Sequence, residues 1–397
     1  MLPSLLAAVS LMLSGVTVLE AQTEKLTYGQ HLLEEASAKH PGISGLEVRL
    51  PKLDQSGAQI LSWGKTGKRS LDLTLQDVTS TAAGEIKVTF PRSTGLTAAQ
   101  QRAEAESIRN DLRGRTLDSF NLFDPFPYDP HFSQNTYGQH VVDETLSAHH
   151  DILVLGLHAK PTDGAASVIL ASNFGRIGKP DDAGDLKIVE TEQPESLVTK
   201  AGNRCNFGLP LHDNLGLTIG LITVAYAYAD GDDKAALMAR AVNLRDEVSR
   251  RLLNKGSLTE NYPLDPTLVG RYYAQLLVEE VLLMHPRVAG VALHVTPPGR
   301  TDNLILASTF GRVGQLSDES DLQMIRSGKH NVHVLPSGMR YSGELTLRDS
   351  ARRTIGALLI IFPYKPGDDT DSLLKEAKQI RQELAARIQN VAELMRR

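Results

Sequence analysis

Histidines and aspartates are the first residues whose types and spacing could do chemistry. They are His158 with Asp182 and Asp185, and His294 with Asp318 and Asp321. An imidazole beside carboxylates can bind a metal ion or move a proton. Neither a His-x-x-x-His nor a Glu-x-x-His pattern supports these uses, and a hydrogen-bonded histidine at a strand end is more common. We therefore expect these residues to line a ligand site, without a metal, a cofactor or a catalytic residue.

Two arginines form the second set. A Phe-Gly-Arg-(Ile/Val)-Gly turn occurs twice and places Arg176 and Arg312 at its centre. Glycines let backbone amides face a ligand, and an arginine can bind a carboxylate through two hydrogen bonds. The turn thus predicts an anionic ligand. The alternative is a structural turn whose arginine pairs with an aspartate of the following segment, Asp182 or Asp185.

Both sets recur because the chain contains a duplication. Residues 136 positions apart match without a gap, from Tyr137 and Tyr273 through to Arg245 and Arg381. The same offset carries the histidines, the Phe-Gly-Arg turns and the aspartates of one copy onto those of the other. It also matches Arg204 with Arg340, which we include among the candidate ligand-binding residues.

A third, degenerate copy lies at the front of the chain. Tyr28-Gly29-Gln30-His31 matches Tyr137-Gly138-Gln139-His140 at an offset of 109, whereas Asp77 matches Asp213 at 136. The difference of 27 is a deletion that removes the counterpart of residues 173–200, including the Phe-Gly-Arg turn and its aspartates. Any ligand chemistry is therefore expected in the part that copy one lacks.

The repeats predict three domains and two linkers. The domains are residues 26–116, 134–254 and 270–391, and the linkers are 117–133 and about 255–270. The linkers are rich in proline and aspartate, and the first also carries aromatic residues that we expect to pack against a neighbouring domain.

The elements that must position the candidate residues are clearest in copy two. The patterns predict helices at about 136–149, 182–191 and 233–252, and strands at 152–159, 168–172, 204–211 and 218–228. Strands joined by hairpins imply an antiparallel sheet with helices on one face. The predicted fold class is α+β, with an N-terminal and a C-terminal helix flanking each sheet.

One segment of copy two resembles a known family. The run from Leu209 to Val224, with its Asp213-x-x-Gly216 turn and the following Thr-Ile-Gly strand, resembles the late hairpin of Cache and PAS-type sensor domains. The resemblance implies PAS-like modules with an extracytoplasmic role in sensing or binding a small molecule. Copy three departs from the pattern, because Arg352 stands where Gly216 does.

The N-terminal 21 residues read as a secretory signal peptide that is cleaved after Ala21. A retained hydrophobic anchor is the alternative. No later segment is apolar for long enough to cross a membrane. The protein is therefore expected in the periplasm or outside the cell.

Composition and motifs narrow the function. The net charge of -5 gives no reason to expect a nucleic-acid partner, and one cysteine excludes a disulfide within the chain. No nucleophile-elbow, phosphate-loop, zincin or dinucleotide motif occurs. We predict an exported, non-enzymatic protein that binds or senses a small, anionic molecule. The alternatives are a scaffold for an envelope or extracellular protein and, less favoured, a hydrolase that uses His/Asp pairs.

Overall fold

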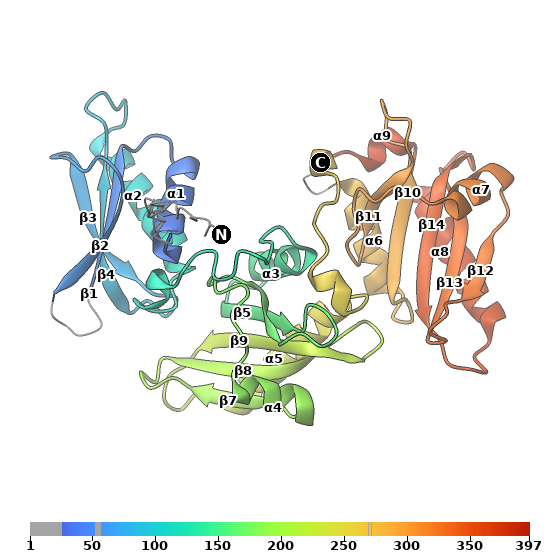
Figure 1. The fold of residues 1–397 in the computed structure, drawn as a ribbon. Helices are drawn as coiled ribbons and strands as arrows, with labels where there is room; N and C mark the ends of the chain where they lie inside the picture. The colour runs from blue at the N-terminus through green and yellow to red at the C-terminus, as the bar shows by residue number, and fades with distance from the viewer. Residues whose placement is uncertain (1–25, 52–56, 269, 271) are drawn as a thin grey trace, which may run out of the picture.

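The computed structural model describes residues 26–51, 57–268, 270 and 272–397, which form three α+β modules (Figure 1). Each module has one antiparallel sheet with a helix before it and a helix after it. This confirms the predicted fold class. The predicted signal peptide, residues 1–21, lies outside the described residues.

Module one is the smallest and has a four-stranded sheet in the order β2-β1-β4-β3. Its elements are α1 (Tyr28–Lys39), β1 (Gly45–Pro51), β2 (Ala58–Gly64), β3 (Ser70–Gln76), β4 (Ala82–Thr89) and α2 (Ala98–Arg113). The short helix η1 (Asn121–Phe123) lies in the linker that follows. Within its described residues, module one has no helix between its second and third strands, as the deletion in copy one predicts.

Modules two and three share one topology, with sheet orders β6-β5-β9-β8-β7 and β11-β10-β14-β13-β12. Module two comprises α3 (Tyr137–Ala148), β5 (Ile152–Ala159), β6 (Val168–Ser172), α4 (Ala183–Thr191), β7 (Glu195–Val198), β8 (Arg204–His212), β9 (Thr218–Ala227) and α5 (Lys234–Ser249). The second linker carries η2 (Lys255–Leu258) and η3 (Pro266–Leu268). Module three comprises α6 (Tyr273–Met284), β10 (Gly290–Val295), β11 (Leu304–Ser308), α7 (Glu319–Ser327), β12 (Asn331–Val334), β13 (Arg340–Arg348), β14 (Thr354–Pro363), α8 (Thr370–Arg387) and α9 (Val391–Leu394).

Local sequence explains where the helices of module two begin. The Thr136 hydroxyl accepts a hydrogen bond from Gln139 N at 3.1 Å, and His149 is the C-terminal cap of α3. Asp182 caps α4 by accepting hydrogen bonds from Gly184 N and Asp185 N, and Asp233 caps α5 in the same way. The two aspartates therefore have the capping role that their positions predict.

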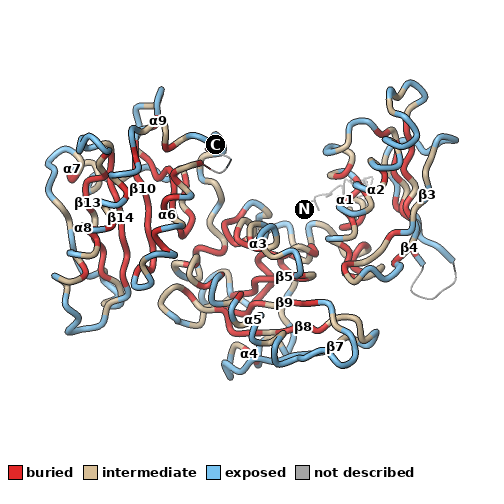
Figure 2. The backbone as a smooth tube through the Cα atoms, turned by 180° about the vertical axis from the view of Figure 1, so that it is seen from behind, coloured by how far each residue is buried: buried red, intermediate tan, exposed pale blue. Residues whose placement is uncertain are grey.

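Strand β8 shows that helices cover both faces of the sheet. Phe207 and Leu209 point into the core that α5 completes. Gly208 lies between them and faces α4, where an added Cβ would lie 2.5 Å from Ile188 Cδ1. Helix α4 therefore lies on the opposite face from α5, which corrects the prediction of helices on one face only. The buried residues follow the strands and the helix sides that face them (Figure 2).

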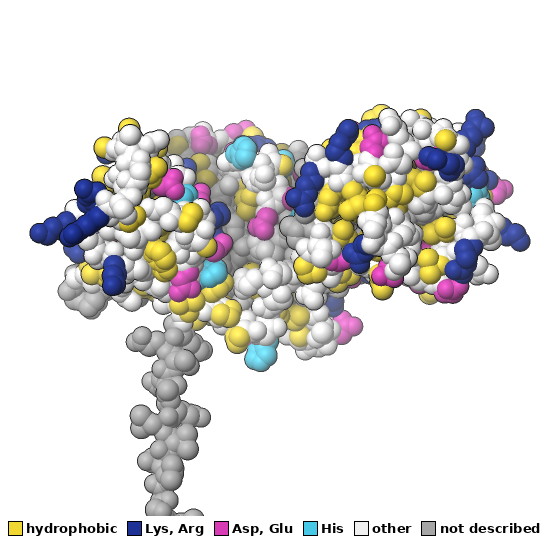
Figure 3. Space-filling view, turned by 90° about the horizontal axis from the view of Figure 1, so that it is seen from above, with side chains coloured by type: hydrophobic (Ala, Val, Ile, Leu, Met, Phe, Trp, Pro, Cys, Tyr) yellow, Lys and Arg dark blue, Asp and Glu magenta, His cyan; other side chains and the backbone are white. Residues whose placement is uncertain are grey.

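The modules are arranged so that module two contacts both others. In the space-filling view, modules one and three form two masses on either side, with module two between and behind them (Figure 3). A small buried cluster joins modules one and two and includes Val78 and Leu117 on one side and Val154, Ile169 and Phe174 on the other. Among the described residues, no helix is long and apolar enough to cross a membrane.

Candidate functional site

Each Phe-Gly-Arg turn receives a tyrosine from the preceding module. Gly175 has a φ of 72°, and an added Cβ would lie 2.9 Å from the Tyr28 ring of module one. Gly311 has a φ of 87°, and an added Cβ would lie equally close to the Tyr137 ring of module two. Both the positive φ and the close ring require glycine. The turns are therefore sockets for tyrosine side chains, and we call each turn with its tyrosine a joint.

Hydrogen bonds hold each tyrosine in its socket. The Tyr137 hydroxyl lies 3.2 Å from Thr309 O of module three and 3.1 Å from Arg251 O, and the Tyr28 hydroxyl lies 3.4 Å from Asn173 O of module two. Tyr28 and Tyr137 are each only 2% exposed. Burial raises the pKa of Tyr137 to about 12, so its hydroxyl stays protonated and can donate.

The two arginines of the turns pair with acids of the linkers. Arg176 Nε lies 2.5 Å from Asp124 Oδ2, and Arg312 contacts both oxygens of Glu260 at 3.1–3.3 Å. Neither arginine lines any of the three clefts described below. Both arginines thus form ion pairs, and their role as a ligand clamp stays a prediction. The partner in each pair is a linker acid, and not Asp182 or Asp185 as the structural alternative predicted.

Arg204 and Arg340 face the preceding module as well. Arg340 Nη2 contacts Asp213 Oδ2 at 3.3 Å and Asn214 Oδ1 at 3.0 Å, both in the hairpin of module two. Burial lowers the pKa of Arg204, and the charges of Asp118 in the first linker and Asp77 in module one oppose that shift. Arg176, Arg312 and Arg340 thus serve the contacts between modules. Copy one, the first of the three modules, lacks the socket that receives a preceding module.

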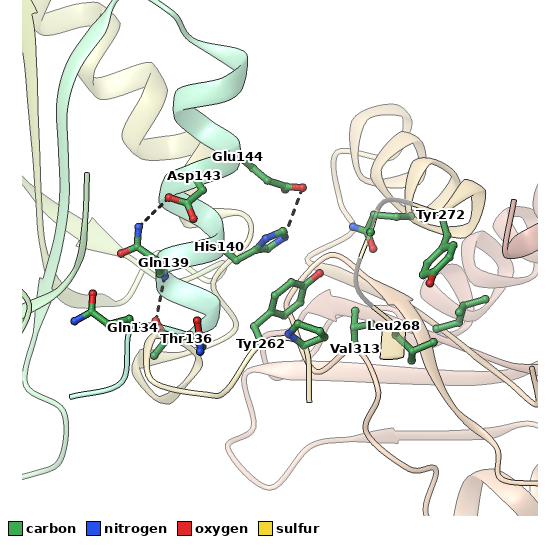
Figure 4. Close-up of a pocket in the computed structure, with 15 residues that line it drawn as sticks. Gln134, Thr136, Gln139, His140, Asp143, Glu144, Tyr262, Leu268, Tyr272 and Val313 are labelled. Carbon is green, nitrogen blue, oxygen red and sulfur yellow. Dashed lines mark hydrogen bonds and ion pairs between the residues drawn. The ribbon is translucent and has the colours of Figure 1, made fainter. Parts of the chain in front are cut away.

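At each junction a histidine stacks on an aromatic ring in a cleft, and Figure 4 shows the cleft between modules two and three. His140 stacks on Tyr262 at 4.0 Å between ring centroids and pairs with Glu144, and the cleft has a volume of about 390 Å³. At the first junction His31 stacks on Phe126 at 3.8 Å in a cleft of about 720 Å³. The predicted packing of the linker aromatics against a neighbouring module is thus seen at Phe126.

An arginine completes each junction. Arg115 contacts Glu35 at 2.5 Å, and Arg251 contacts Glu144 at 2.5 Å. Copy three keeps the corresponding pair but has Leu276 at the histidine position. The histidine is therefore present at both junctions and is replaced by leucine in module three, a signal that the sequence repeat itself carries.

The first junction makes stability depend on pH. The His31 hydrogen bond and Arg115 hold the pKa of Glu35 at about 2, against 4.5 for an ordinary glutamate. Because the folded pKa is lower, this stabilisation is complete above about pH 4.5 and is lost as the pH falls toward 2. We expect urea unfolding of a Glu35→Gln variant to show less destabilisation than wild type over this interval. Parallel pH profiles of the two proteins would contradict the assignment.

The histidines of the first strands lie beside carboxylates. His158 Nδ1 lies 2.7 Å from Asp181 Oδ1, and Asp185 is near both. Asp182 does not join them, because its side chain caps α4. In module three His294 Nδ1 lies 3.1 Å from Asp321 Oδ2, whereas Asp318 caps α7. The structure thus brings together His158 with Asp185 and His294 with Asp321, and leaves Asp182 and Asp318 apart.

Module three also has a cleft lined by arginines, which our sequence reading did not select. Its volume is about 520 Å³, and Arg348, Arg352 and Arg381 line it. Asp349 is the carboxylate among the described lining residues, and it already accepts hydrogen bonds from Arg353 N and Nε at 2.9 and 2.7 Å. We call the cleft that these three arginines line the arginine cleft.

The charges in the arginine cleft repel one another. Burial and the neighbouring Arg348 lower the pKa of Arg381. Burial and Arg381 lower the pKa of the His330 imidazole, with Lys378 and Arg348 adding to the effect. Arg348 Nε is buried and has no hydrogen-bond partner. The cleft therefore has a cationic surplus that a bound anion would offset.

Comparisons with known proteins identify no family. Neither a known protein family nor a curated protein matches the sequence. Solved structures that resemble parts of the chain include the inducer-binding domain of PobR from Acinetobacter in complex with 3-hydroxybenzoic acid, with 10% identity over 30% of this chain and 95% of that chain, at a TM-score of 0.18. The E. coli DhaR(N)–DhaL complex shows 13% identity, 57% and 84% coverage and a TM-score of 0.22. PelD from Pseudomonas aeruginosa in complex with c-di-GMP shows 14% identity over 64% of this chain and 77% of that chain, at a TM-score of 0.23. TM-scores this low carry no information on function.

Proposed function

We propose that this chain is an exported, non-enzymatic protein that binds a small anion in the arginine cleft of module three. The observation that carries the proposal is that three arginines line the cleft, while the Asp349 carboxylate beside them is already paired with Arg353. The joints hold the three modules together and leave this cleft open to solvent. The export part of the proposal rests on residues 1–21.

The other copies show how the cleft differs from its counterparts. In module two the position of Arg348 holds His212, and Arg245 is neutralised by Asp246 at 2.6 Å. In module three Gln382 replaces that aspartate. This surface of the fold therefore carries one arginine in module two, which is paired with Asp246. In module three it carries three arginines, and the position of that aspartate holds Gln382.

The backbone of Arg352 adopts a left-handed conformation, as does that of Ser80 at the matching position of module one. Arg352 has a φ of 63°, whereas the matching Gly216 has a φ of 83°. A residue other than glycine in this left-handed region costs about 1–2 kcal/mol. The arginine thus occupies a position where glycine would be more stable.

Guanidinium groups favour ligands that offer planar or tetrahedral oxygens. We infer a small molecule with carboxylate or phosphate groups, because both accept paired hydrogen bonds from arginine. A nucleic-acid partner is not proposed, because the chain as a whole is acidic.

Calorimetric titration with citrate and inorganic phosphate tests the proposal. At low ionic strength, where screening is weakest, we expect wild type to bind and an Arg348→Gln variant to bind at least about tenfold more weakly. An Arg352→Gly variant should also bind more weakly and yet be more stable by about 1 kcal/mol, because the strained backbone is relieved. An Arg245→Gln variant in module two is the matched control and should bind as wild type does.

Two results would contradict the anion site. The first is that wild type binds neither probe at millimolar concentration. The second is that both cleft variants keep the wild-type affinity. Mass spectrometry of protein secreted by an expressing bacterium tests export separately, and a mass that still includes residues 1–21 would contradict the proposed cleavage.

A further inference from the structure

We propose that His158, Asp181 and Asp185 of module two bind a divalent transition-metal ion. Their ligand atoms all lie within 4.8 Å of one another. The three residues come from β5, from the loop that precedes α4 and from the first turn of α4, so the fold itself brings them together. This site is separate from the arginine cleft, and the proposal does not depend on the anion site.

Burial gives the first argument for the ion. The Asp181 side chain is 0% exposed and that of His158 is 5% exposed. Among the described residues, Asp181 Oδ2 has no hydrogen-bond partner, and Asp181 Oδ1 lies 2.7 Å from His158 Nδ1. A buried carboxylate with so few donors is costly unless an opposite charge is bound beside it.

The surrounding charges point the same way. Asp185 adds a second carboxylate, whose ligand oxygen lies within 4.8 Å of those of His158 and Asp181. One imidazole does not balance two carboxylates. A divalent cation bound by all three would balance them and would use the unpartnered oxygen of Asp181.

Thr223 holds the imidazole in a suitable orientation. Its hydroxyl lies 3.2 Å from His158 Nε2, so Nδ1 faces the carboxylates. A hydrogen bond to the second ring nitrogen is the usual support of a metal-binding histidine. One nitrogen and two carboxylate oxygens suit Zn²⁺ or Mn²⁺. Thr223 is thus a positioning residue, and the other three are the ligands.

Module three offers an internal control because it has lost two parts of this arrangement. Ser317 stands at the position of Asp181, and Leu359 stands at the position of Thr223. His294 Nδ1 there contacts Ser317 Oγ at 2.9 Å, and His294 Nε2 has no partner. Module three folds with these residues, so transplanting them into module two is expected to leave the fold intact.

Calorimetric titration of the full chain, freed of metal by chelation, tests the site with ZnCl₂ and MnCl₂. We expect wild type to bind one equivalent and Asp181→Ser to bind at least about tenfold more weakly. Ser317→Ala in module three is the matched control and should keep one equivalent. Circular dichroism of each variant shows whether it is folded, and the visible spectrum of bound Co²⁺ should be lost in Asp181→Ser.

A gain of binding provides a second readout. The double variant S317D/L359T should bind two equivalents, because it rebuilds the arrangement in module three. One equivalent in that folded variant would mean that these positions do not define a site. Absence of binding to wild type at millimolar metal, or unchanged binding by folded Asp181→Ser, would overturn the proposal.

Discussion

Replacing Gly311 by alanine is expected to loosen module three from module two at a cost of about 2–4 kcal/mol. The new Cβ would lie 2.9 Å from the Tyr137 ring, and alanine is strained at a φ of 87°. The collision falls on Tyr137, which belongs to the core of module two and reaches into module three at the contact between the modules. We therefore expect calorimetry to show module three unfolding separately and earlier than in wild type.

The chain offers a matched control for this variant. Gly367 has a φ of 98°, and an added Cβ there would have no atom within 4 Å. A Gly367→Ala variant should therefore lose only about 1–2 kcal/mol from the backbone and should keep the wild-type pattern of transitions. If both variants give the same transitions, the tyrosine socket does not hold the modules together.

Replacing Arg340 by methionine should cost about 3–5 kcal/mol, the second large effect that we expect. The Arg340 side chain is 11% exposed, and that of its partner Asp213 is 3% exposed. The variant leaves the Asp213 carboxylate buried between modules without its cation. Arg340 also contacts Asn214 and Leu253 O, so the loss extends across the hairpin of module two.

A double-mutant cycle separates this ion pair from its surroundings. The double variant Arg340→Met/Asp213→Asn should lose much less stability than the sum of the losses in the two single variants. In the double variant neither charge is buried without its partner. The free energies come from urea unfolding. Additive single effects would mean that the pair does not couple the two modules.

The repeat explains why so much of the fold could be predicted. A gap-free offset let each copy support the assignment of the other, and the strongly apolar strands β9 and β14 had only one interpretation. Strands β7 and β12 were not predicted. They are mostly exposed, and their sequences Glu-Ser-Leu-Val and Asn-Val-His-Val show no buried face that would mark a strand.

The candidate site was harder to predict because its contacts cross between modules. The acids that bind Arg176 and Arg312 lie 52 residues earlier in the chain, in linkers whose path the sequence does not reveal. Asp124 and Glu260 are nevertheless related by the same offset of 136, which was a usable signal. The sequence prediction selected Asp182, which caps α4, and not its neighbour Asp181, which contacts His158. Adjacent aspartates cannot be told apart from their positions in the sequence.

Small-angle X-ray scattering tests most directly whether the Phe-Gly-Arg turns join the modules into one array. Wild-type scattering should fit a single arrangement of the three modules, and a Gly175→Ala/Gly311→Ala variant should have a larger radius of gyration, whereas Gly367→Ala should not. Wild-type scattering that requires many module arrangements, or a double variant with an unchanged profile, would contradict the account.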